Sequence, residues 1–137
     1  MSICGRCNSR TERPCAYADT TAEYYAALIS ALRHVAYRYG YALATHGSLK
    51  SDIDLLAVPW RDTAVSAESL AEAIRKTAEA ITGTARVRVA DKKLFPELKP
   101  CGRLAWAFYL TPYDSVAGPY IDLSVMPKEQ SGKRRKP

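Results

Sequence analysis

The sequence contains no long hydrophobic run, and no apolar stretch approaches the ~18 residues that a membrane span requires. The first residues are polar, Arg6 and Arg10 among them, and lack the apolar segment of a secretory signal. We therefore expect a cytoplasmic location and no membrane partner. With 47% apolar and 25% charged residues, the composition argues against a disordered or fibrous chain.

Cysteine is scarce, and without a secretory signal the four cysteines are not expected to form disulfides. The spacing of Cys4 and Cys7 is typical of a zinc knuckle, and Cys15 follows eight residues later. A structural zinc ion needs four ligands, so a fourth would come from elsewhere in the fold: Cys101, His34 or His46. Two interpretations stay open, a structural Zn²⁺ at Cys4, Cys7 and Cys15, or free thiols on a loose N-terminal arm.

Positive charge is concentrated at the C-terminus. The net charge is +6, and Lys133, Arg134, Arg135 and Lys136 supply most of it. A short basic tail attracts any polyanion, so it is either a solvated, solubilising end or a contact for a nucleic acid.

The pattern of apolar residues predicts one domain with three parts: a cysteine-containing arm (1–18), a folded domain (19–127) and a flexible basic tail (128–137). Thr20 to Glu23 has the form of a capping box, which predicts a helix over about 20–39 that ends at Gly40. A second helix is predicted from the N-cap Ser66 to Gly83, with an apolar face made of Leu70, Ile74, Thr77, Ala78 and Ile81.

Strands are predicted at 41–46, 53–58, 85–89, 104–110 and 120–126, since these segments are apolar or alternate between apolar and polar residues. Trp106 and Phe108 alternate with small residues and are expected in the core. The order helix, two strands, helix, three strands predicts an α+β fold, a mixed β-sheet with the helices on one face.

Three aspartates interrupt these apolar strands. Asp52 and Asp54 bracket Ile53, and residues two apart on a strand point to the same face. Asp122 alternates with Ile121 and Leu123, so it also leaves the apolar face. If the last strand lies beside the second, the three carboxylates converge on the open side of the sheet. Clustered carboxylates suit Mg²⁺ or Mn²⁺, which take oxygen ligands and substrate phosphates.

Gly47 and Ser48 lie in the short connection before Asp52. Glycine lets the backbone approach a phosphate closely, and successive backbone N–H groups in such a turn form an anion-binding nest. Lys50 adds a positive charge to the same connection. This connection is therefore a candidate nucleotide-binding element, with Lys92, Lys93 and Arg103 as further candidate phosphate contacts.

Together these motifs resemble the nucleotidyltransferase superfamily typified by DNA polymerase beta. The resemblance is carried by Gly47-Ser48, by Asp52-Ile53-Asp54-Leu55 and by Ile121-Asp122-Leu123, and it extends over about residues 20–126. It looks closest to small single-domain members. It implies a nucleotidyltransferase-like fold and transfer of NMP from an NTP with release of pyrophosphate.

The resemblance also implies the roles of residues. Asp52, Asp54 and Asp122 would be the catalytic, metal-binding carboxylates, and Gly47, Ser48 and Lys50 would contact the nucleotide. No segment after Met126 resembles a second domain that would hold the acceptor, which could be a nucleic acid or a protein. That surface would come from a second subunit, from a partner protein, or not at all. The alternative is a catalytically inactive member that binds nucleotide, nucleic acid or a protein partner, in the manner of an antitoxin or a regulatory subunit.

Overall fold

The computed structural model describes residues 16–49, 52–83, 85, 96–110 and 119–128. Within these residues the chain forms two α-helices and a five-stranded sheet. Their bounds, in chain order, are α1 (Ala16–Arg38), β1 (Tyr41–His46), β2 (Ile53–Pro59), α2 (Ala67–Thr82), β3 (Glu97–Leu98), the 3₁₀ turn η1 (Pro100–Gly102), β4 (Leu104–Tyr109) and β5 (Tyr120–Val125).

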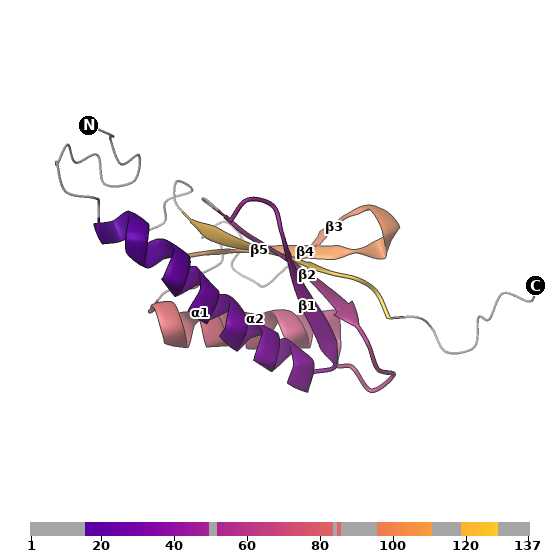
Figure 1. Ribbon diagram of the computed structural model, residues 1–137. Helices are drawn as coiled ribbons and strands as arrows, with labels where there is room; N and C mark the ends of the chain where they lie inside the picture. Colours follow the sequence, from indigo (N-terminus) through magenta and orange to yellow (C-terminus); the bar gives the residue numbers. More distant parts are fainter. Residues whose placement is uncertain (1–15, 50–51, 84, 86–95, 111–118, 129–137) are drawn as a thin grey trace, which may run out of the picture.

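The sheet has the strand order β1-β2-β5-β4-β3. The neighbours β1 and β2 form an antiparallel hairpin, whereas β5 inserts between β2 and β4, parallel to β2 and antiparallel to β4. Both helices lie on the same side of the sheet (Figure 1). The predicted α+β class, with a mixed sheet and helices on one face, is confirmed, and so is the expectation that the last strand lies beside the second.

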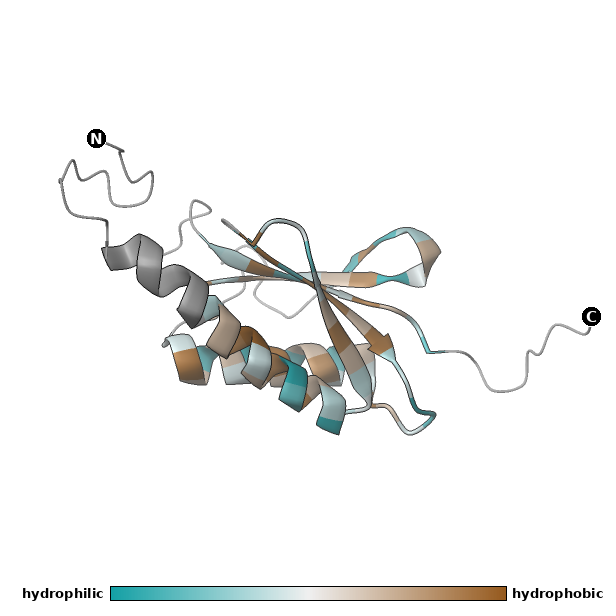
Figure 2. Ribbon diagram, viewed as in Figure 1, coloured by the Kyte–Doolittle hydropathy of each residue, from teal (hydrophilic) through white to brown (hydrophobic). Residues whose placement is uncertain are grey.

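The core lies between the two helices and one face of the sheet. Ile53, Leu55 and Ala57 of β2 are fully buried, and the residues between them are at least partly exposed. On β5 the fully buried positions are Ile121, Leu123 and Val125. Apolar positions recur in the strands and along α2 (Figure 2). Because residues alternate along a strand, burying one face leaves the other face of the sheet free of helices, and this open face carries the aspartates.

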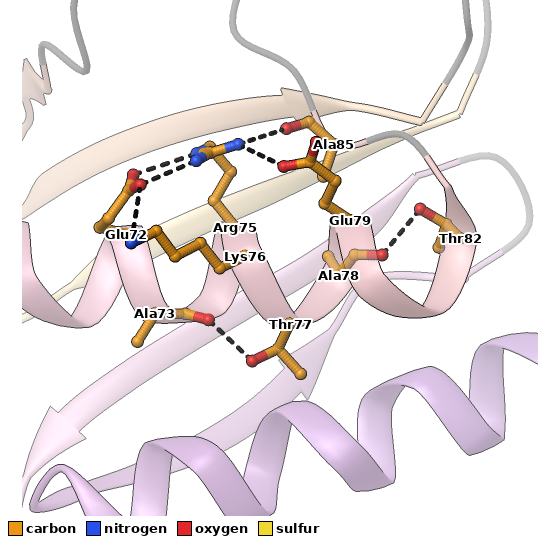
Figure 3. A network of polar contacts seen from close by, with 9 residues as sticks. All are labelled: Glu72, Ala73, Arg75, Lys76, Thr77, Ala78, Glu79, Thr82 and Ala85. Carbon is orange, nitrogen blue, oxygen red and sulfur yellow. Dashed lines mark hydrogen bonds and ion pairs between the residues drawn. The ribbon is translucent and has the colours of Figure 1, made fainter.

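Helix α2 has the ends that the sequence predicts. The Ser66 hydroxyl accepts a hydrogen bond from the backbone N–H of Ser69, and Gly83 adopts the left-handed conformation after the last turn. On the solvent side, Arg75 pairs with Glu72 at 2.7 Å and with Glu79 at 2.8 Å (Figure 3). Arg75 also donates to the carbonyl oxygen of Ala85, so its side chain holds the residue that follows the helix.

Three details of the predicted elements were wrong. Helix α1 begins at Ala16, inside the predicted arm, and not at a capping box at Thr20. Alanine has the highest helix propensity, and Ala16 and Ala18 allow the helix to extend further back. Ile81, expected on the apolar face of α2, is 42% exposed in the last turn. The two-residue strand β3 was not predicted, because it is too short to show an alternating pattern.

Trp106 and Phe108 belong to the core as expected. The predicted strand at 85–89 falls, apart from Ala85, outside the described residues. In the part of the chain that the structure describes, neither helix is long and apolar enough to cross a membrane.

Candidate active site

The register of the parallel pair β2–β5 places Asp54 directly beside Asp122. Both side chains are partly exposed on the open face of the sheet, while Ile53 and Ile121, their neighbours in sequence, are fully buried on the other face. Burial of the isoleucines in the core therefore fixes the direction of both carboxylates. The antiparallel pairing of β1 with β2 adds His46 to the same row, next to Asp54.

Asp52 and Tyr120 form a second pair at the same end of the sheet. Asp52 directly precedes β2, and Tyr120 is the first residue of β5. Asp52 lies close enough to Tyr120 for its negative charge to act on the hydroxyl group of that residue. Burial, followed by the negative charges of Asp52, Asp122 and Asp54, raises the pKa of the Tyr120 hydroxyl. The three aspartates thus lie close enough to act on one phenol.

Gly47 brings the backbone of the β1–β2 connection against one of these carboxylates. Its φ of +77° lies in the left-handed region that favours glycine. A Cβ atom at this position would lie 2.5 Å from Oδ2 of Asp54, closer than non-bonded atoms approach one another. Gly47 is therefore required here for two reasons, its backbone conformation and the space that the Asp54 carboxylate occupies.

The electrostatics of the site centre on Asp122. Burial raises the pKa of the Asp122 carboxyl group, and the negative charge of Asp54 raises it further. Positive charge from His46, Lys99 and Arg103 acts in the opposite direction but does not cancel the effect. Burial and the neighbouring Asp54 therefore both favour the neutral form of the Asp122 carboxyl group.

The basic side chains come from the hairpin at the far side of the sheet. Lys99 lies between β3 and η1 and pairs with Glu97 at 2.8 Å. Arg103 directly precedes β4, and its Nη1 donates to Oγ of Ser124 on β5 at 3.5 Å. Arg103 was a candidate phosphate contact in the sequence; Lys99, His46 and Tyr120 were not assigned to the site. The charge of Lys99 and the position of Tyr120 before Asp122 were visible signals, but only the sheet order brings them to the carboxylates.

The donor set of the site suits a hard divalent cation. Asp54 and Asp122 offer carboxylate oxygens from adjacent strands, the ligand type that such cations prefer. Among the described residues, no group of three or more His, Cys, Asp or Glu side chains is arranged to hold a metal ion. A cation at this place would therefore take at most these two carboxylates, and water and phosphate oxygens would have to supply its other ligands.

The structure describes only some of the other predicted site residues. Ser48 is exposed beside Gly47. Lys50, Lys92 and Lys93 lie outside the described residues, as do Cys4, Cys7 and, one residue before α1, Cys15. Cys101 is a free, exposed thiol in η1, and His34 is exposed on α1. Zinc binding by these cysteines, with His34 or His46 as a further candidate ligand, stays a prediction.

Comparisons with known proteins give no relative. No protein-family model matches the chain, and no curated protein or solved structure matches it.

Proposed function

We propose that the protein is a metal-dependent nucleotidyltransferase that moves NMP from an NTP to a hydroxyl-bearing acceptor, with the reaction at Asp52, Asp54 and Asp122. The observation that carries the proposal is the register of Asp54 beside Asp122 on parallel strands, under the backbone of Gly47. This arrangement supports the resemblance to nucleotidyltransferases, in which an acidic pair on one strand meets a third carboxylate on a later strand. A nucleotidyltransferase-like fold is part of the same proposal.

In this reaction an oxygen of the acceptor attacks the α-phosphorus of the NTP. A new P–O bond forms to the acceptor, the bond between the α-phosphorus and the oxygen bridging to the β-phosphate breaks, and pyrophosphate leaves. The proton of the acceptor hydroxyl passes to water. Charge accumulates on the phosphate oxygens, so the site must supply positive charge that is fixed in position before the reaction.

Bound Mg²⁺ or Mn²⁺ would supply Lewis-acid stabilisation of these oxygens. The residues that would hold it are Asp54 and Asp122, with Asp52 at the end of the site. Tyr120 lies beside Asp52, and the negative charges of the three aspartates act on its hydroxyl group. Gly47 leaves room for a phosphate to approach the backbone of the hairpin, because any larger residue would place a carbon atom against Asp54.

Lys99 and Arg103 are the positive side chains that face Asp122 from the β3–β4 hairpin. We assign them to the phosphates of the NTP, which would bring negative charge to the same region. Each is now engaged with a neighbour, Lys99 with Glu97 and Arg103 with Ser124, and these contacts orient both side chains before a nucleotide binds.

The test is release of pyrophosphate from each of the four NTPs in Mg²⁺ or Mn²⁺, with RNA, protein and small hydroxyl compounds offered as acceptors. We expect activity that Asp54→Asn lowers at least 100-fold, because Asn keeps the shape of Asp and loses the charge. Asp62→Asn, in an exposed loop beyond the other end of β2, is the matched control and should leave the rate unchanged.

Pyrophosphate release that is equal in wild type and Asp54→Asn would overturn the proposal. Nucleotide binding without turnover, unchanged by Asp54→Asn, would identify the alternative, a fold of this kind that binds without catalysis.

A further inference from the structure

A second exposed surface lies beyond the other end of β2. Tyr37 on α1 and Trp60 after β2 stack on each other, with ring centroids 5.2 Å apart and an angle of 20° between the planes. Tyr37 is 62% exposed and Trp60 is 47% exposed. Exposed apolar side chains that lie against each other form a contiguous patch, and such patches mark interaction sites more often than scattered ones do. We call this pair the aromatic platform.

The backbone around the aromatic platform is firmly held. The backbone N–H of Trp60 donates to the carbonyl oxygen of Gly40 at 3.0 Å, and that of Val65 donates to Tyr39 at 3.1 Å. Gly40 packs so closely on the loop after β2 that a Cβ atom there would lie 2.7 Å from Cα of Ala64. The loop is thus fixed to the end of α1, and binding to the aromatic platform would cost little ordering of the protein.

The charge around the aromatic platform is positive. Arg61 lies with its guanidinium carbon 5.2 Å from the ring centre of Trp60, and its Nη2 donates to the carbonyl oxygen of Arg38. Arg38 is exposed, and hydrophilic positions mark this end of α1 (Figure 2). No acidic residue occurs from Tyr25 to Tyr41, and Asp62 is the one acid in the loop 60–65.

The basic C-terminal tail begins next to this surface. The Nζ group of Lys128 donates to the carbonyl oxygen of Ala64, in the same loop as Trp60 and Arg61. Lys128 therefore adds a further positive charge to the loop that carries Trp60 and Arg61.

We infer that this surface binds single-stranded nucleic acid, with a base stacked on the aromatic platform and with Arg38 and Arg61 on the phosphates. Stacked aromatic rings beside arginines are the means by which proteins hold single strands, because every base has a flat face and every nucleotide has a charge. A duplex keeps its bases stacked inside and would gain only the phosphate contacts. The absence of acidic residues on this part of α1 favours a polyanion over a protein partner of mixed charge.

The test measures binding of fluorescein-labelled oligouridine and oligothymidine, each about twelve nucleotides long, to the full chain by fluorescence anisotropy. We expect both single strands to bind more tightly than a duplex of equal length. Tyr37→Ala should weaken binding about tenfold, since Ala suits a helix and the lost stacking is large. The RNA and DNA arms show which single strand is preferred.

The matched control is Lys76→Ala, which removes one exposed positive charge from α2, away from the aromatic platform. It should change the affinity less than twofold. Arg38→Ala should lower the slope of log Kd against log salt by about 0.7, the value for one phosphate contact on a single strand.

A second measurement avoids substitutions of Tyr37. The chain has two tryptophans, and Trp106→Phe leaves Trp60 as the sole one. Trp106 is in the core, and within the described residues its buried indole N–H has no hydrogen-bond partner, so Phe should be tolerated there. Binding of oligouridine should then quench the fluorescence of Trp60. Equal loss of affinity in Tyr37→Ala and Lys76→Ala would overturn the inference, and so would an absence of Trp60 quenching. An absence of binding at low salt would also overturn it and would favour a protein partner.

Discussion

The backbone of Gly47 lies so close to Asp54 that a Cβ atom added to the glycine would sit 2.5 Å from Oδ2 of the carboxylate. The two residues belong to one hairpin, in which Asp54 is the partner of His46, the residue before Gly47. The conformation of the connection and the placement of the carboxylate therefore depend on each other.

The first prediction concerns this contact. Gly47→Ala should lower the free energy of unfolding by about 1–2 kcal/mol for the left-handed backbone and more for displacement of the Asp54 side chain. It should also weaken Mn²⁺ binding. Gly83→Ala is the matched control, since Gly83 has a similar φ of +82° but no atom within 4 Å of the added carbon. Urea denaturation of both variants measures the difference, and equal losses would show that Asp54 does not restrict this position.

The second prediction concerns pH. The folded protein raises the pKa of Asp122, so the folded state holds its proton more tightly than the unfolded chain does. The contribution of Asp122 to the free energy of unfolding is therefore present below the ordinary pKa of 3.8. It is lost as the pH rises through the raised pKa of the folded state. Asp54→Asn removes one cause of the shift and should bring the pKa of Asp122 closer to 3.8.

Carbon-13 NMR of the side-chain carboxyl groups, recorded without metal, measures this titration directly. Asp62→Asn should leave the titration of Asp122 unchanged. A pKa of Asp122 that is the same in wild type and Asp54→Asn would contradict the coupling of the two carboxylates.

The third prediction concerns metal ions. A cation that binds the folded state alone raises stability by mass action, by about 2.7 kcal/mol at 100 times its dissociation constant. Thermal melting in millimolar Mn²⁺ or Mg²⁺ should therefore show a higher Tm for the wild type. The shift should be smaller in Asp122→Asn, and equal shifts would place the metal elsewhere.

The fourth prediction concerns the tail. Deleting residues 131–137 removes Lys133, Arg134, Arg135 and Lys136, all of which follow the last strand. The Tm and any Mn²⁺ affinity should be unchanged, whereas affinity for oligouridine should fall and depend less on salt, because each phosphate contact releases counterions. Anisotropy titrations at several salt concentrations measure this, and an unchanged slope would identify the tail as a solubilising end.

Local patterns in the sequence predicted most of the fold. The ends of α2 and the strands β1, β2 and β5 are marked by capping residues, glycines and alternation, and these lie within one residue of the prediction. The start of α1 was missed because alanine, which favours a helix, continues the pattern past Thr20. Strand β3 was missed because two residues of a strand exist only through their pairing with β4.

The sequence predicts those site residues whose direction follows from alternation along a strand. It does not predict those that reach the site only through the order of the strands in the sheet. Asp52, Asp54 and Asp122 interrupt apolar strands, which is visible in the sequence. Tyr120 belongs to the site because β5 pairs with its neighbours, and Lys99 belongs to it because of the course of the β3–β4 hairpin. Long-range pairing of this kind leaves no local pattern.

The parallel pairing of β2 with β5 has a consequence for the order in which the molecule forms. The β1–β2 hairpin joins strands that are neighbours in sequence. Strands β2 and β5, by contrast, are separated in the chain by α2 and the β3–β4 hairpin. Closing a longer loop costs more entropy, so this pairing is expected late in folding. A nascent chain that ends before Tyr120 can form the hairpin with Gly47 and Asp54 but has no partner for the carboxylate. The repulsion between Asp54 and Asp122 is then a cost that arises only at the end of folding.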